Sequence, residues 1–186
     1  EILEQRNANR EQGNDPEKAC YLPGIPRATY MDHPFQIIQG GGDILMAYEY
    51  ASANRVIQMR DIDIPPIDTW MGTSYGRWEG NTLVVTTLAQ NGETWLDRSG
   101  NFLAPTTTVT ERFTPLGPNH MDYQVTFDDP ELYTRPWTIQ MPLYRRMEQN
   151  AQLLEFKCVP FAEMYLYGDL YETMDDEAKA RLGVTE

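Results

Sequence analysis

The sequence predicts a mainly β fold, an antiparallel lipocalin-like barrel or sandwich, with a helical N-terminal arm and a C-terminal helix. Two observations lead to this prediction. About seven to nine short β-prone segments recur, with turn signals about every 8 to 12 residues. No helical pattern separates these segments, which argues against a parallel α/β fold. The 186 residues suit one domain, with an arm at 1–34, a β core at 35–158 and a helical tail at 159–186.

The N-terminal arm is polar. Residues 1–14 have weak helical spacing and predict a helix that ends near Gly13. Asp15 followed by Pro16 is typical of a helix N-cap and first helical residue, so a short helical segment is expected through Cys20.

The β core begins at Phe35. The glycines at 40–42 predict a tight hairpin turn, because glycine adopts positive φ without a Cβ penalty. The paired prolines at 65–66 predict an extended loop. The Asp128-Asp129-Pro130 segment predicts a turn in which aspartate binds its own backbone. Strands are expected at 35–39, 44–50, 55–60, 82–88, 106–114, 121–129, 137–143 and 151–158.

The tail predicts a helix over 174–182. Thr173 is its candidate N-cap, and acidic residues follow in the first turn. Lys179 and Arg181 lie near the end, and Gly183 follows, which matches the helix dipole at both termini.

The net charge and the distribution of apolar residues exclude some classes of partner. The formal charge of −13 disfavours nucleic acid and anionic membranes as partners. No window approaches the roughly 20 apolar residues of a membrane helix, so no membrane span is expected. The sequence begins with Glu1 rather than methionine, and we expect that a signal peptide was removed from a periplasmic or secreted protein.

The two cysteines, Cys20 and Cys158, could form a disulfide that closes a loop of roughly 140 residues and stabilises the fold by about 4 to 5 kcal/mol. Two buried free thiols are the alternative. The missing start methionine favours the disulfide, because such bonds form in oxidising compartments.

Motifs for metals, cofactors and nucleophiles are weak. His33 and His120 are far apart in sequence and have no metal-ligand spacing. Ser74 has the form G-x-S-x-G, but a proline-rich loop precedes it and a predicted strand follows, unlike a nucleophile elbow. We therefore predict no metal and no cofactor.

Carboxylates are the stronger catalytic candidates. Glu111 shares strand parity with Val109 and Phe113, so it is expected to point toward the core, where burial would raise its pKa. Glu49 has a similar pattern. The alternative is that both form structural ion pairs with arginines. Glu111 or Asp97 could serve as general base in a hydrolase or isomerase that needs no cofactor.

Aromatic residues gather at predicted strand ends and loops, where a barrel opens. Tryptophan there is typical of a pocket for an apolar or aromatic ligand, although core and corner packing explains the same pattern. The predicted contacts are Tyr48, Glu49, Trp70, Tyr75, Arg77, Trp78 and Glu111.

The segments TWMG-S-GRWEG-TLVV, TWLDR-G, VTERF and DDP--YT-PW resemble a widespread family of uncharacterised exported bacterial proteins, over roughly residues 20–160. The resemblance implies export and supports pairing of Cys20 with Cys158, but it implies no activity. Family members often carry histidine after TWLDR-G, where this chain has residues 101–105, NFLAP.

The resulting expectation is an extracytoplasmic binding module for a small apolar or aromatic ligand. A first alternative is an accessory subunit of a larger extracytoplasmic assembly, because the segment at 161–174 is rich in tyrosine and methionine. The second alternative is the enzyme without metal or cofactor.

Overall fold

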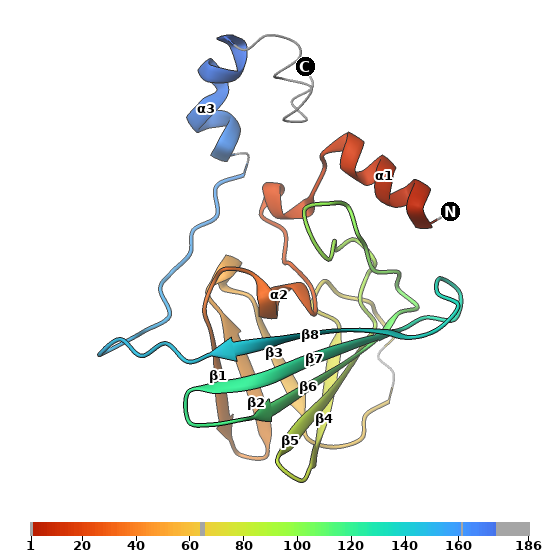
Figure 1. Cartoon of the computed structure of the whole chain (residues 1–186), viewed down its shortest axis with the longest axis vertical. Coiled ribbons are helices and arrows are strands. Elements are labelled where there is room, and N and C mark those ends of the chain that lie inside the picture. Colours follow the sequence, from red (N-terminus) through yellow and green to blue (C-terminus); the bar gives the residue numbers. More distant parts are fainter. Residues whose placement is uncertain (1, 64–65, 161, 174–186) are drawn as a thin grey trace.

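The computed structural model describes residues 2–63, 66–160 and 162–173. Its centre is one eight-stranded sheet in which the strands follow each other in chain order and curl into a half-barrel (Figure 1). This confirms the predicted mainly β, barrel-like fold. The strands are β1 (Phe35–Gly40), β2 (Asp43–Tyr48), β3 (Asn54–Gln58), β4 (Thr73–Glu79), β5 (Thr82–Leu88), β6 (Thr108–Pro115), β7 (His120–Asp128) and β8 (Trp137–Tyr144).

The sheet is mixed, which corrects the expectation of purely antiparallel pairing. β3 and β4 pair in parallel, with Ile57 opposite Ser74, while the other neighbouring strands are antiparallel. The cause is the long proline-containing connection between Gln58 and Thr73. It returns the chain to the end of the sheet where β3 began, and a two-residue hairpin could not do so.

Alternating burial along the strands shows which face holds the core. Tyr123, Val125 and Phe127 of β7 are each fully buried, as the alternation predicted. Glu111 of β6 is also buried between Val109 and Phe113. The concave side of the sheet is therefore filled with side chains at its centre, and hollows are left toward its ends.

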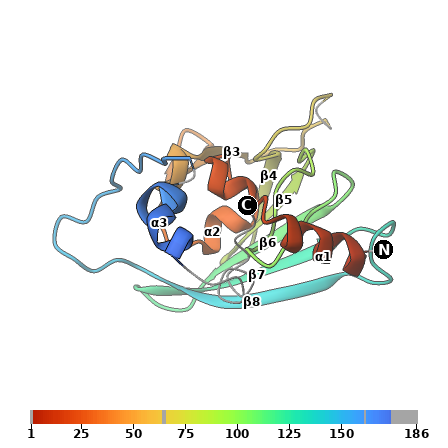
Figure 2. The same ribbon diagram turned by 90° about the horizontal axis from the view of Figure 1, so that it is seen from above.

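Helices cover the concave side. α1 (Ile2–Gln12) and the 3-10 helix η1 (Pro16–Ala19) confirm the predicted arm, and Asp15 accepts a hydrogen bond from the Glu17 amide at 3.0 Å as predicted. α2 (Arg27–Tyr30) lies on the concave side of the sheet, and three of its four residues are buried. A second 3-10 helix, η2 (Tyr50–Ser52), links β2 to β3. Figure 2 shows α1 beside the β7 and β8 end of the sheet.

Residues 145–160 form an irregular segment, here called the strap, that runs from β8 back to the arm. The strand predicted at 151–158 is wrong, because this part of the chain binds the arm and the β2–β3 connection instead of a strand. The Leu154 amide donates to the Glu49 carboxylate at 2.9 Å, and Phe156 packs on His33 and Tyr50.

The chain continues into α3 (Ala162–Thr173), which stands away from the sheet (Figure 1). The helix predicted at 174–182 lies outside the described residues.

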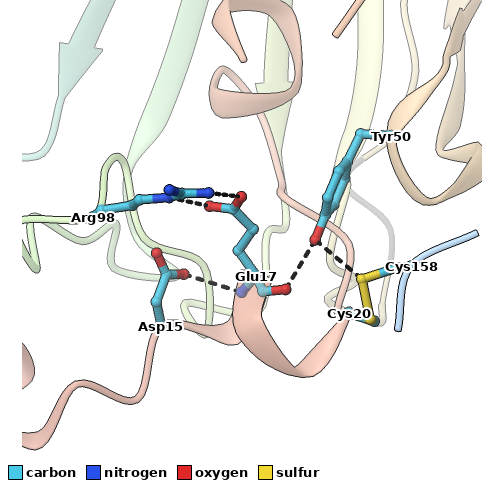
Figure 3. Close-up of a disulfide and its surroundings, with 6 residues drawn as sticks. All are labelled: Asp15, Glu17, Cys20, Tyr50, Arg98 and Cys158. Carbon is cyan, nitrogen blue, oxygen red and sulfur yellow. Dashed lines mark hydrogen bonds and ion pairs between the residues drawn. A yellow bond between two sulfur atoms is a disulfide. The ribbon is translucent and has the colours of Figure 1, made fainter. Parts of the chain in front are cut away.

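A disulfide between Cys20 and Cys158 ties the strap to the arm, as predicted (Figure 3). The hydroxyl of Tyr50 lies beside it, donating to the Glu17 carbonyl oxygen at 3.0 Å and lying 3.9 Å from Cys158 Sγ. Burial raises the pKa of Tyr50 to about 12, so this phenol stays protonated as a donor. The disulfide thus joins two regions that are 138 residues apart in sequence.

Candidate ligand-binding site

Glu111 forms a buried ion pair with Arg55 in the centre of the half-barrel. Its carboxylate accepts hydrogen bonds from Arg55 Nη1 at 2.5 Å and Nη2 at 3.0 Å, and from the Tyr123 hydroxyl at 2.7 Å. Ser74 and Thr87 face the same guanidinium from β4 and β5, and Met46 Sδ lies 3.1 Å from its Nη2, while its Nε has no acceptor among the described residues.

The surroundings of this pair keep the Arg55 guanidinium charged. Burial lowers the pKa of Arg55, but the adjacent Glu111 carboxylate outweighs that effect and raises it. Burial and the Glu111 charge together raise the pKa of Tyr123, which therefore remains a neutral donor. Glu111 is 0% exposed and lines neither of the cavities described below, so the geometry is that of a structural pair.

The other predicted contact residues are dispersed over the molecule. Tyr48 is buried, with its hydroxyl 3.3 Å from Thr29 Oγ1, and Glu49 holds the strap. Trp70 stacks on Tyr21 of the arm, with ring centroids 4.8 Å apart. Tyr75 and Arg77 alternate on β4 with the inward-facing Ser74 and Gly76.

Arg77 donates to Glu79 at the exposed end of β4, and Trp78 is half exposed there. The stretch at 69–85 is thus a loop-to-strand corner, and the structure does not bring these seven residues into one pocket.

A different hollow, here called the α1 pocket, lies between α1, α2, the loop at 96–102 and the start of β8. Its volume is about 470 Å³, and its walls are largely apolar and aromatic. It is lined by Ile2, Arg6, Tyr30, Leu96, Asp97, Asn101, Phe102, Phe127, Tyr133, Trp137, Ile139 and Met141.

The alternation of β8 produces one wall of this pocket. Trp137, Ile139 and Met141 face the concave side and are half buried, whereas the intervening residues are exposed. The Trp137 ring stacks on Phe127 with centroids 4.1 Å apart, and Tyr133 meets it edge-on at 5.7 Å. The stacked and edge-on contacts join these three rings into one aromatic wall.

Tyr133 is positioned by the turn after β7. Asp129 caps this turn, accepting hydrogen bonds from the amides of Glu131 at 3.0 Å and Leu132 at 3.2 Å, which confirms the predicted aspartate turn. Burial would raise the pKa of Asp129, but hydrogen bonds from Thr107 and Thr106 outweigh it and lower that pKa.

α1 forms one side of the pocket and packs on the loop that follows Leu96. Asn9 Nδ2 donates to the Gly100 carbonyl oxygen at 3.1 Å, and a Cβ at Gly100 would lie only 2.6 Å from the Arg6 carbonyl oxygen. Asp97 shapes the same loop, because its carboxylate accepts from the Ser99 amide at 2.8 Å and from Asn101 Nδ2 at 2.6 Å.

An ion-pair cluster fixes the arm between α1 and α2. Arg27 donates to both oxygens of Asp15, at 2.9 and 2.8 Å, and also contacts Glu17. Arg98 of the loop donates to Glu17 at 2.8 Å (Figure 3). Burial lowers the pKa of Arg27, but Asp15 and Glu17 outweigh it and raise that pKa, so the guanidinium stays charged.

Two buried donors of the pocket lining have no acceptor within the described residues. They are the Nε of Arg6 and the Nε1 of the Trp137 indole. Burial raises the pKa of Tyr133, and the adjacent Trp137 lowers it. The Tyr133 hydroxyl does not lie in a position to accept a hydrogen bond of good geometry from Trp137 Nε1. The Tyr30 hydroxyl is satisfied, since it donates to the Leu96 carbonyl oxygen at 2.7 Å.

A second hollow of about 750 Å³ lies where the start of β1, the end of β8 and the strap meet. Both histidines, His33 and His120, line it, although they are far apart in sequence. It is lined by many exposed polar side chains, so we regard the α1 pocket as the better candidate site.

Some residues that line the α1 pocket can be recognised from the sequence alone. Tyr133 and Trp137 are two of the aromatic residues at predicted strand ends and loops, and Asp97 is one of the two candidate general bases. The alternation at 137–143 marks the apolar wall. Nothing in the sequence indicated that α1, a polar helix, would supply Arg6 to the same hollow.

Comparisons with protein-family models, curated proteins and solved structures find no match in any of the three. Within the part of the chain that the structure describes, no group of three or more potential metal ligands is close enough to hold an ion. No helix among those residues has the length and apolar character required to cross a membrane.

Proposed function

We propose that the protein is an extracytoplasmic binding module whose α1 pocket takes a small apolar or aromatic ligand. The observation that carries this proposal is the aromatic wall of Phe127, Tyr133 and Trp137 facing a hollow of about 470 Å³. A concave, mostly apolar hollow with a few convergent polar groups is the usual form of a small-molecule site.

The size of the pocket sets the scale of affinity. A bicyclic ligand that buried about 200 Å² of apolar surface would gain about 5 kcal/mol from desolvation. Stacking on Trp137 adds to this gain, while lost translational and rotational freedom opposes it. Dissociation constants of about 0.1 to 1 mM are the expected outcome, because a gain of this size lies between the values for millimolar and micromolar binding.

The first test uses the neutral fluorescent probe N-phenyl-1-naphthylamine and a variant that fills the pocket. Ile139→Trp places a large side chain in the hollow and should abolish the rise in probe fluorescence. The matched control is Thr138→Trp, because Thr138 is the preceding residue of β8 and is exposed. Equal probe binding by wild type and both variants would contradict the proposal.

The location outside the cytoplasm is part of the same proposal. The Cys20–Cys158 disulfide supports it, because disulfides persist mainly in oxidising compartments. Recovery of the native protein from the periplasm or the medium with this bond intact is the expected result. Native protein found in the cytoplasm with both thiols reduced would contradict it.

A second candidate function is that of an accessory subunit in a larger assembly. α3 favours it, since this helix stands away from the sheet (Figure 1) and its Tyr165 and Leu166 are 78% and 73% exposed. Exposed apolar side chains on one element commonly mark protein interfaces. Light scattering after native purification should then show a complex that is lost in Tyr165→Ser/Leu166→Ser, and a monomer would count against this candidate.

A further inference from the structure

We propose that the free edge of β1 binds an extended, acidic segment of a partner protein, which adds to the sheet as a further strand beside the second hollow. β1 is the first strand of the sheet, so it has a neighbouring strand on one side only (Figure 1). β1 contributes no residue to the α1 pocket, so this surface is separate from the ligand site proposed above.

The register of β1 against β2 shows which backbone groups of β1 lack a strand partner. The Glu49 amide donates to the Pro34 carbonyl oxygen at 3.0 Å, which places Pro34 in a hydrogen-bonded pair. Bonded and non-bonded positions alternate along an antiparallel pair, so the even-numbered residues of β1 bond to β2. The N–H and C=O groups of Phe35, Ile37 and Gln39 therefore point away from β2, and they bond to no other segment among the described residues.

This edge can be reached from solvent, because residues 36–40 are all exposed. Phe35 packs on the buried Tyr48, with ring centroids 5.6 Å apart, so it faces the concave side of the sheet. By alternation Ile37 faces the same side, where it lines the second hollow, and Ile38 faces the convex side. An exposed edge strand with apolar side chains and unpaired backbone groups is a template for pairing with another chain.

The other edge of the sheet, on β8, is less suited to a further strand. The Arg145 amide donates to the Asn119 carbonyl oxygen at 2.8 Å, so the odd-numbered residues of β8 bond to β7. Pro142 therefore lies at a position that faces away from β7, and it has no N–H to donate. β1 contains neither a proline nor a charged residue, the two features that commonly protect an edge strand. The added strand is thus expected on β1.

The side chains around the second hollow indicate the chemical class of the added strand. Among the described residues that line this hollow none is acidic, although the chain contains 28 aspartates and glutamates. Arg145 and Arg146 are in the lining, and Arg146 pairs with Glu148 at 3.3 Å. Arg145 is exposed and has no ion pair with a described residue. A carboxylate of the incoming segment would supply its counter-ion.

Two acidic groups lie beside the hollow and must be weighed against Arg145. Asp32 and Glu49 lie 3.8 and 3.9 Å from ring nitrogens of His33, but neither lines the hollow. One oxygen of Glu49 already accepts from the Leu154 amide. At about 0.15 M salt, acidic residues more than about 8 Å away are largely screened. The local charge of Arg145 therefore decides which segment is preferred.

A second copy of the chain is the other occupant that β1 could pair with. The sequence of β1 is FQIIQG, which brings no carboxylate to Arg145. A whole second copy also brings a formal charge of −13, which opposes its association with an equally charged chain. A short acidic segment of a different protein therefore fits this edge better.

The experiment measures the fluorescence anisotropy of two rhodamine-labelled peptides with amidated C-termini, TVTVTVDE and TVTVTVNQ. They are added to the intact, disulfide-bonded protein at neutral pH and about 0.15 M salt. Both should bind, and the acidic peptide should bind about twofold to fivefold more tightly, as expected for an exposed ion pair. Arg145→Gln should remove this preference. Arg135→Gln should keep it, because Arg135 precedes β8, is exposed and is absent from the lining of the hollow.

A second pair of variants tests the backbone pairing. Ile37→Pro removes an outward N–H of β1 and should weaken both peptides about fivefold or more. Gln140→Pro is the matched control, because the Gln140 N–H faces outward on the other edge of the sheet, away from the hollow. TVTVTVDE that is N-methylated at every second amide tests the same pairing on the unmodified protein. Of the two possible N-methylation registers, one should bind and the other should not.

The remaining outcomes would overturn the inference. Absence of peptide binding by the intact protein, or equal binding by Ile37→Pro and Gln140→Pro, would exclude strand addition at β1. Equal loss of the acidic preference in Arg135→Gln and Arg145→Gln would show a general charge effect. A dimer in light scattering that Ile37→Pro dissociates and the peptides do not displace would identify a second copy as the occupant. N-phenyl-1-naphthylamine should bind every variant equally, so failure here is distinguishable from failure of the proposed function.

Discussion

At the scale of single residues, burial decides what a charged group can do. Glu111 is a candidate general base from the sequence because it shares a strand face with Val109 and Phe113, and an ion pair with an arginine is the alternative. In the structure, Arg55 and Tyr123 take up its oxygens in a sealed interior. The sequence could indicate that Glu111 points inward, but not whether an arginine from another strand would meet it there.

Replacement of this carboxylate tests its structural role. Glu111→Gln leaves the Arg55 charge buried without a counter-ion, so we expect the free energy of unfolding to fall by about 3 to 5 kcal/mol. Glu79→Gln is the control, because Glu79 pairs with Arg77 and Arg112 at the surface, where ion pairs contribute little, and its loss should leave the stability nearly unchanged. Urea denaturation measures both. Similar small losses in the two variants would disprove a structural role for Glu111.

At the scale of elements, local patterns predicted most strands and the arm, but not the pairing of distant segments. The alternation of β7 and the Asp15–Pro16 cap are local signals, and the structure has both. Residues 151–158 have β-type composition, yet the disulfide and Glu49 hold them in the strap. The parallel pairing of β3 with β4 depends on the course of a loop, which residue pattern alone does not encode.

The contact between α1 and the loop at Gly100 can be tested by substituting this glycine. Gly100 has a φ of +84°, and a Cβ there would meet the backbone of α1. Gly100→Ala should therefore displace α1 and weaken binding of N-phenyl-1-naphthylamine. Gly80→Ala is the matched control, since Gly80 also has positive φ (+61°) but no atom lies within 4 Å of the added Cβ.

Both substitutions impose backbone strain of about 1 to 2 kcal/mol, so a loss of stability by itself does not identify the collision with α1. Probe affinity does, because only Gly100→Ala disturbs the element that covers the pocket. Unchanged affinity in Gly100→Ala would mean that α1 does not contribute to the site.

At the scale of the whole molecule, the half-barrel remains open between β1 and β8, and the strap and the arm bridge the concave side instead. Among the described residues, a single covalent link joins these two segments, and the Glu17 and Tyr50 contacts surround it (Figure 3). Because the closed loop spans 138 residues, the bond removes much of the conformational freedom of the unfolded chain.

Cys20→Ser/Cys158→Ser should therefore unfold at lower urea concentration than the oxidised protein, with a loss of about 2 to 5 kcal/mol. Adding a reductant should produce a similar loss in wild type and none in the double variant, which separates the bond from the effect of serine. The β7–β8 wall does not depend on the strap, so N-phenyl-1-naphthylamine should still bind the folded double variant. If reduction leaves the urea midpoint of wild type unchanged, the arm and strap are held by their non-covalent contacts, and the bond is dispensable for stability.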